Sequence, residues 1–141
     1  MRLNKFTGGL KVKDIEEIRE FFSHDMYAAD TGAYIEEVGD NYAKVSLTLN
    51  KHHKNAVGGV MGGVYFTLAD FAFAVASNWQ KPGTVSITSD ISFIGVPKSD
   101  KVIAETELIK NGRSTCCYNV RVTDDLGTPL AAVKIVGFHK E

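Results

Sequence analysis

The feature that most constrains the fold of this chain is a run of apolar residues that directly follows a cluster of glycines. Gly58, Gly59, Gly62 and Gly63 fall within six residues, and the run from 64 to 75 contains no proline or glycine. Its Leu, Ala, Phe and Val residues would place apolar side chains on all sides of a helix, and a helix of that kind has to be buried. We therefore predict a buried helix in this stretch, around which the rest of the chain is arranged.

Asp70 is the only charged residue in this apolar run. A carboxylate in a buried helix costs free energy to desolvate unless it is paired or hydrogen-bonded. Two interpretations follow: Asp70 is a functional group that faces a pocket, or it accepts hydrogen bonds from backbone N–H groups. We favour the first, because ionisable groups in such surroundings concentrate at functional sites.

The length and charge of the chain limit its class and its partners. With 141 residues and a formal net charge of −1, it fits a single domain over residues 1–141 and gives no electrostatic reason to expect nucleic acid or an anionic membrane as a partner. The best apolar segment is interrupted by Asp70 before it reaches the roughly 18 residues needed to span a bilayer. We therefore expect neither nucleic acid nor a membrane as a partner.

Cys116 and Cys117 are the two cysteines of the chain, and they are adjacent. Neighbouring residues in a strand point to opposite faces, so the two thiols are poor disulfide partners. We expect both to be ordinary strand residues in a protein kept in a reducing, cytoplasmic setting.

The remaining elements indicate an α+β fold. Residues 13–23 have apolar side chains at helical spacing with Asp14 as a cap, and residues 24–32 are predicted to form a loop. Six segments with turn signals between them are predicted strands: 34–38, 42–49, 85–94, 101–110, 113–123 and 129–138. Strands grouped around one apolar helix predict a strongly curved antiparallel sheet wrapped around that helix.

This order of elements, together with residues 55–78, resembles the hotdog fold and within it the PaaI-type acyl-CoA thioesterases. The family pattern is Asn or Gln, then His-Gly-Gly, then a helix with Leu-Ala-Asp or Leu-Ala-Glu. The matching residues here are Asn55, Met61-Gly62-Gly63 and Leu68-Ala69-Asp70. The resemblance implies a curved antiparallel sheet around one long central helix, a short N-terminal helix, and hydrolysis of an aryl or medium-chain acyl-CoA.

The resemblance also implies catalytic roles. Asp70 would act as nucleophile or general base, and Gly62 at the helix N-terminus would donate its N–H to the thioester oxygen. Asn55 would orient the water or the carbonyl group. Ser86 matches a Ser or Thr of the family that helps to hold water, although Thr88 lies on the same face of a regular strand. No cofactor and no metal are implied.

The resemblance further implies contacts with the substrate and an assembly. Met61 and Gly63 would lie beside the substrate, and Ser114 would contact it next to Arg113. From their charge, Lys98, Lys110 and Arg113 are either a cluster that meets the phosphates of coenzyme A or scattered surface bases. The family's active sites lie between protomers, so Asn55 and Gly62 of one chain would face Asp70 of another in a homodimer or homotetramer.

One residue departs from the family pattern: Met61 stands where the family has a histidine. Methionine cannot donate a hydrogen bond near the substrate. An alternative function is therefore a non-catalytic acyl-CoA-binding protein on the same fold.

Other chemistries have less support in the sequence. His52 and His53 form a pair in a polar loop, which we interpret as solvated rather than metal-binding because no cysteine or carboxylate lies at ligand spacing. There is no Gly-x-Ser-x-Gly motif for a serine hydrolase.

Overall fold

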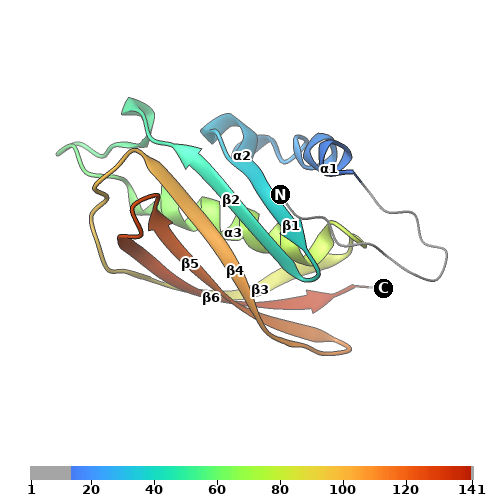
Figure 1. Ribbon diagram of the computed structural model, residues 1–141. Helices are drawn as coiled ribbons and strands as arrows, with labels where there is room; N and C mark the ends of the chain where they lie inside the picture. Colours follow the sequence, from blue (N-terminus) through green and yellow to red (C-terminus); the bar gives the residue numbers. More distant parts are fainter. Residues whose placement is uncertain (1–13, 141) are drawn as a thin grey trace.

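A computed structural model gives the structure of the chain and describes residues 14–140 (Figure 1). The helices are α1 (Ile15–Phe22), α2 (Met26–Thr31) and α3 (Gly62–Asn78), with a short 3₁₀ helix at Lys51–His53. The strands are β1 (Tyr34–Gly39), β2 (Tyr42–Thr48), β3 (Thr84–Phe93), β4 (Lys101–Asn111), β5 (Thr115–Asp124) and β6 (Pro129–His139). The six predicted strands are therefore confirmed, with shifts of one or two residues at their ends.

The strands form one antiparallel sheet in the order β1-β2-β4-β5-β6-β3. The β1–β2 hairpin turns at Asp40 and Asn41, where Asn41 has a left-handed backbone (φ 52°). Strands β4, β5 and β6 form an antiparallel meander, and β3 lies beyond β6 at the edge of the sheet.

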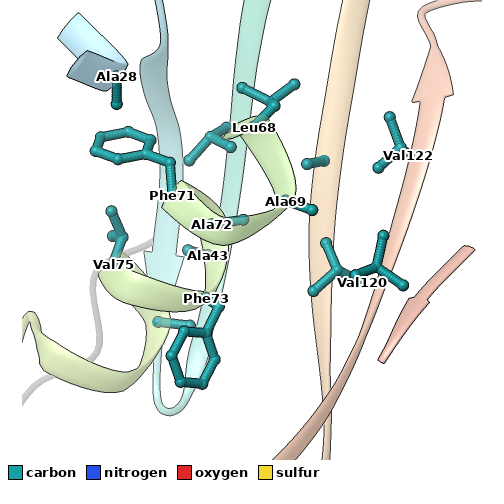
Figure 2. Close-up of a cluster of buried hydrophobic side chains, with 14 of the residues drawn as sticks. Ala28, Ala43, Leu68, Ala69, Phe71, Ala72, Phe73, Val75, Val120 and Val122 are labelled. Carbon is teal, nitrogen blue, oxygen red and sulfur yellow. The ribbon is translucent and has the colours of Figure 1, made fainter. Parts of the chain in front are cut away.

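Helix α3 lies against one face of the curved sheet (Figure 1). Leu68, Ala69, Ala72 and Val75 are buried on its sheet-facing side, and Figure 2 shows them beside the strands. At the end of the helix the indole Nε1 of Trp79 donates to the Gly39 oxygen at 2.8 Å, which ties α3 to the β1–β2 turn. The predicted central helix is confirmed.

One face of α3 is not covered by residues 14–140. Residues at intervals of three or four along the helix keep solvent exposure: Gly63, Phe66, Asp70, Ala74 and Ser77. The prediction of a helix buried on every side therefore differs from the structure, because the sheet curves around only part of it.

The predicted N-terminal helix is confirmed as α1, although Lys13 lies outside the described residues. The predicted loop over 24–32 is wrong, because six of its residues form α2. Only Ala28 of α2 is buried, so there is no apolar periodicity to read, and Gly32 ends the helix with a left-handed backbone (φ 101°).

Strand β3 departs from the regular alternation predicted for residues 85–94. Its register with β6 pairs Ser86 with Gly137 but Thr88 with Val136, so a bulge lies between them. Paired residues in an antiparallel sheet share a face, and a side chain at Gly137 would meet the Phe73 ring of α3. Ser86 therefore faces the helix and Thr88 faces away, and the expectation that both share one face is wrong.

Within residues 14–140, no helix is long and apolar enough to cross a membrane.

Candidate active site

Asp70 lies midway along α3, on the face that the sheet leaves open, and lines a pocket between α2 and α3. We call this the Asp70 pocket; its volume is about 280 Å³. Its lining is Asp25, Met26, Tyr27 and Ala28 from the α2 segment, and Thr67, Asp70, Phe71 and Ala74 from α3. Asp70 and Phe71 are each three or four positions from both Thr67 and Ala74, so the four residues from α3 form one stripe of the helix.

The carboxylate of Asp70 is placed where its charge is disfavoured. Burial raises its pKa above the usual range, and the nearby carboxylate of Asp25 raises it further. Among residues 14–140, no group donates a hydrogen bond to Asp70 that would compensate for this burial. The alternative in which Asp70 accepts backbone hydrogen bonds is therefore absent from residues 14–140, and a functional role for Asp70 stays a prediction.

Asp124 shows what a structural carboxylate looks like in the same chain. It is buried at the end of β5, and its oxygens accept backbone N–H groups of Lys98 (2.7 Å), Leu126 (3.0 Å) and Thr128 (2.9 Å). Burial opposes the charge of Asp124, but these hydrogen bonds outweigh it and hold its pKa at about 2. Asp70 has no comparable set of donors.

Asn55 lies in the loop between β2 and α3, which projects beyond the end of the sheet (Figure 1). Its side-chain oxygen accepts the N–H groups of Val57 and Gly59, each at 3.0 Å. That oxygen therefore holds the glycine-rich loop. The amide Nδ2 donates to no group in the described chain, so Asn55 presents a donor to a ligand rather than both a donor and an acceptor.

Gly62 and Gly63 begin α3, and their N–H groups have no acceptor within residues 14–140. Unpaired N–H groups in the first turn of a helix, with the positive end of the helix dipole, favour an anionic oxygen. The first turn of α3 therefore has free N–H groups of the kind that an oxyanion site uses, and the catalytic role of Gly62 stays a prediction.

The structure also gives a local reason for the glycine at 62. A Cβ atom there would lie 2.8 Å from Cε1 of Phe93, which ends β3. Phe93 is 56% exposed and its ring is the flexible end of a side chain, so it has room to move. Sequence reasoning missed this contact because Phe93 is distant in sequence.

The two halves of the predicted catalytic set are separated within one chain. Gly62 and Asp70 are eight residues apart in one helix, which is about 12 Å along its axis. Asn55 lies on the Gly62 side, in the loop that precedes the helix. One thioester cannot touch both halves in the same chain, because each group has to be within about 3 Å of the reacting atoms.

His53 was predicted to be solvated, and this is wrong: its side chain is buried. Its Nδ1 accepts the Asn50 N–H at 2.9 Å, and its Nε2 donates to the Thr31 oxygen at 2.9 Å. His53 thus fixes the loop that carries Asn55 against the end of α2. Among residues 14–140 no three His, Cys, Asp or Glu side chains are grouped as metal ligands.

The other predicted site residues are spread over the molecule. Met61 is 58% exposed just before α3, and Ser86 faces the helix layer from the edge strand. Arg113 lies in the β4–β5 turn beside Ser114 and lines a polar pocket of about 340 Å³ with Lys81, His139 and Lys140. Lys98 donates its N–H to Asp124 at the opposite end of β5, about 30 Å away along the strand. Lys98 and Arg113 of one chain therefore do not lie together.

The pair of carboxylates predicts a pH effect. Asp25→Asn removes a negative charge beside Asp70, so it should lower the pKa of Asp70 and extend activity to more acidic pH. The acid limb of the profile of kcat/KM against pH should move to lower pH. The control is Asp30→Asn, which changes an exposed residue of α2 outside the pocket and should leave the acid limb in place. An unmoved acid limb in Asp25→Asn would show that the titrating group is not Asp70.

Comparison with known proteins points to one family. A model of the Thioesterase superfamily matches residues 57–131, which is just over half of the 141-residue chain. The match includes the glycine cluster, α3 and most of the β3–β6 region.

Individual relatives agree with this match. The chain is 29% identical over 126 residues to a protein of Archaeoglobus fulgidus named as a candidate esterase, covering 88% of this chain and 82% of that protein. It is 27% identical over 104 residues to acyl-coenzyme A thioesterase PaaI of Escherichia coli, covering 73% of this chain and 74% of that protein. A solved structure of a hypothetical thioesterase protein with coenzyme A from Streptococcus pneumoniae TIGR4 superposes with a TM-score of 0.78 at 23% identity, covering 86% of this chain and 95% of that one. The predicted hotdog fold is confirmed.

Proposed function

Because the chain belongs to the thioesterase superfamily, we propose that it hydrolyses acyl-CoA thioesters to a free acid and coenzyme A. The acyl-CoA substrate is supported by the similarity to the PaaI thioesterase and by the fold shared with a thioesterase that binds coenzyme A. The observation that carries the proposal is the Asp70 carboxylate, which lines a pocket, has its pKa raised by burial and receives no compensating hydrogen bond in the described chain.

In the proposed reaction Asp70 acts on the thioester carbonyl in one of two ways. As a nucleophile it bonds to the carbonyl carbon, and the resulting anhydride is hydrolysed by water. As a general base it takes a proton from a water molecule that attacks the same carbon. In both routes the carbonyl oxygen of the thioester becomes an oxyanion. The C–S bond then breaks, and coenzyme A leaves as a thiolate that is protonated afterwards. The Gly62 N–H stabilises the oxyanion, and the Asn55 Nδ2 group donates to the carbonyl or water oxygen.

The proposed site requires two copies of the chain, with Asn55 and Gly62 from one and Asp70 from the other. The separation of about 12 Å between the half-sites supports this. Two surfaces that the described part of the chain leaves uncovered offer an interface: the open stripe of α3 and the edge strand β3. Ile87 and Phe93 on β3 are each more than half exposed, and an open edge with apolar side chains is a liability unless another chain covers it. A homodimer is the smallest assembly that completes the site.

We propose that coenzyme A phosphates bind at the β4–β5 turn, where Arg113 shares a polar pocket with Lys81 and Lys140. Arginine and lysine donors suit phosphate oxygens, and none of the residues 14–140 that line this pocket is acidic. Ser114 lies next to Arg113 in the same turn. Lys98 lies at the end of β5 opposite to Arg113. It could therefore contact the same coenzyme A molecule as Arg113 only if the two residues come from different chains.

The experiment that tests this function is thiol release from a panel of aryl, short-chain and medium-chain acyl-CoAs. We expect steady-state turnover with at least one member and saturation with substrate. Binding of acyl-CoA without turnover across the panel would contradict hydrolysis and favour the non-catalytic alternative suggested by Met61. Absence of both binding and turnover would contradict an acyl-CoA ligand altogether.

A further inference from the structure

A second pocket lies behind the Asp70 pocket, on the other side of Phe71. Its volume is about 200 Å³, and it is formed between α1, the end of α2 and the start of β1, with Phe22, Ala29, Ala33 and Ile35 in its lining. Among the described residues, Phe71 alone lines both pockets. The two cavities therefore meet at a single side chain.

The Phe71 ring is held in place between the two cavities. It is only 6% exposed, and it packs edge-to-face against Phe22 with ring centroids 6.2 Å apart. Figure 2 shows the ring on the α2 side of α3, directed towards Ala28, whereas Phe73 points away from it. Helix α2 contributes Met26, Tyr27 and Ala28 to the Asp70 pocket and Ala29 to the second pocket, so among residues 14–140 the Phe71 ring is the one large side chain that both linings share.

The second pocket suits an apolar chain. Arg19 is the charged group in its lining, and the guanidinium of Arg19 already donates to the Ile35 oxygen through Nε (2.9 Å) and Nη2 (2.7 Å) and to Glu16 through Nη1. The other lining residues are mostly aromatic or aliphatic. An alkyl chain that passed Phe71 would therefore bury apolar surface without displacing a charge from water.

We infer that Phe71 is the residue that limits the length of the acyl group. This inference rests on the proposed function and adds to it a specificity-determining side chain. With the carbonyl at Asp70, the acyl group occupies the Asp70 pocket, and the Phe71 ring closes that pocket towards the second one. The wild-type pocket of about 280 Å³ lies at the lower end of the range for small-molecule sites, which fits a short or aryl acyl group.

The test compares wild type, Phe71→Leu and Phe71→Ala on a series of saturated acyl-CoAs of increasing length. Phe71→Ala should raise kcat/KM for chains longer than the wild-type optimum by about tenfold or more, in line with the effect of methylene groups in a pocket. Phe71→Leu should shift the preferred chain length by less than Phe71→Ala does. It can be used for the comparison if Phe71→Ala folds poorly. Adding Ala29→Leu to Phe71→Ala refills the second pocket and should move the optimum back to shorter chains.

A matched control separates specificity from lost packing. Phe73→Ala removes an equally buried ring from the same helix, but Phe73 packs against Tyr118 and lines neither pocket. It should lower stability without changing the preferred chain length.

Binding of non-hydrolysable S-alkyl-CoA thioethers, measured by calorimetry, keeps the inference testable if turnover is absent. A longer optimum for binding in Phe71→Ala without hydrolysis by any variant would support the pocket and contradict the proposed function. Turnover with an unchanged length profile in both Phe71 variants, or thioether binding with an unchanged profile, would overturn the inference.

Discussion

Asp70→Asn should reduce kcat by about a hundredfold or more while acyl-CoA still binds, because loss of a general base or nucleophile typically has at least that effect. The substitution keeps nearly the same volume and removes only the charge and the basic oxygen. Rates have to be measured per folded molecule, with binding of an S-alkyl-CoA thioether followed in parallel. Turnover close to wild type in a folded Asp70→Asn protein would show that the carboxylate is not catalytic.

The same variant has a distinct stability signature. The pKa of Asp70 is raised by burial and by Asp25, so the folded protein binds its proton more tightly than the unfolded chain does. Ionised Asp70 therefore destabilises the fold, and this cost sets in as pH rises from the unfolded pKa through the folded one. At neutral pH, Asp70→Asn should unfold at the same or a higher temperature than wild type.

Asp124→Asn provides the opposite control. The pKa of Asp124 is lowered to about 2 by backbone hydrogen bonds, so its charge stabilises the fold above the pKa of the unfolded state, and this contribution is lost as pH falls towards 2. Asp124→Asn should therefore lower the unfolding temperature at neutral pH. A fall in unfolding temperature for Asp70→Asn as large as that for Asp124→Asn would favour a structural role for Asp70.

The second large effect is expected at Gly62. Two substitutions at this position distinguish the effect of losing the N–H donor from the effect of adding a Cβ atom. Gly62→Pro removes the N–H, and Gly62→Ala retains it, while both add a Cβ atom that displaces the Phe93 ring. Proline is tolerated at the first position of a helix, and Met61 already has an extended backbone (φ −66°, ψ 135°) that is compatible with a following proline.

We expect Gly62→Pro to lower kcat by about a hundredfold to a thousandfold relative to Gly62→Ala, the range found when one oxyanion donor is removed. Steady-state kinetics on the same acyl-CoA, with circular dichroism to confirm that α3 persists, make the comparison. Equal kcat values for the two variants would contradict a role for the Gly62 N–H and assign the glycine to its contact with Phe93.

Much of the fold was predictable because its signals are local. The apolar run after the glycines predicted α3, and alternating residues between turn signals predicted all six strands. The resemblance to the PaaI-type pattern indicated Asn55, Gly62 and Asp70 as a candidate site, and it could be seen because all three lie in one short segment of the chain. Gly62 and Asp70 fall where local patterns are strong, at the start and the middle of one helix, and Asn55 lies in the loop before that helix.

The features that sequence reasoning missed depend on contacts between distant segments. Helix α2 buries only Ala28, so nothing in its sequence showed that it would lie over Asp70. The bulge in β3, which turns Thr88 away from the face of Ser86, is defined by pairing with β6. His53 looked like a solvated loop residue because its partner, Thr31, is 22 positions away.

The most direct test of the central claim, a thioesterase site shared between two chains, is complementation between two inactive variants. Asp70→Asn and Gly62→Pro, carrying different affinity tags, are co-expressed, and dimers with one copy of each are purified through both tags. In such a dimer one site has both defects and the other has neither, so we expect about half of the wild-type acyl-CoA turnover per dimer, although each variant alone is nearly inactive. Turnover of the mixed dimer no higher than that of the two single variants would contradict a site that combines Gly62 of one chain with Asp70 of the other.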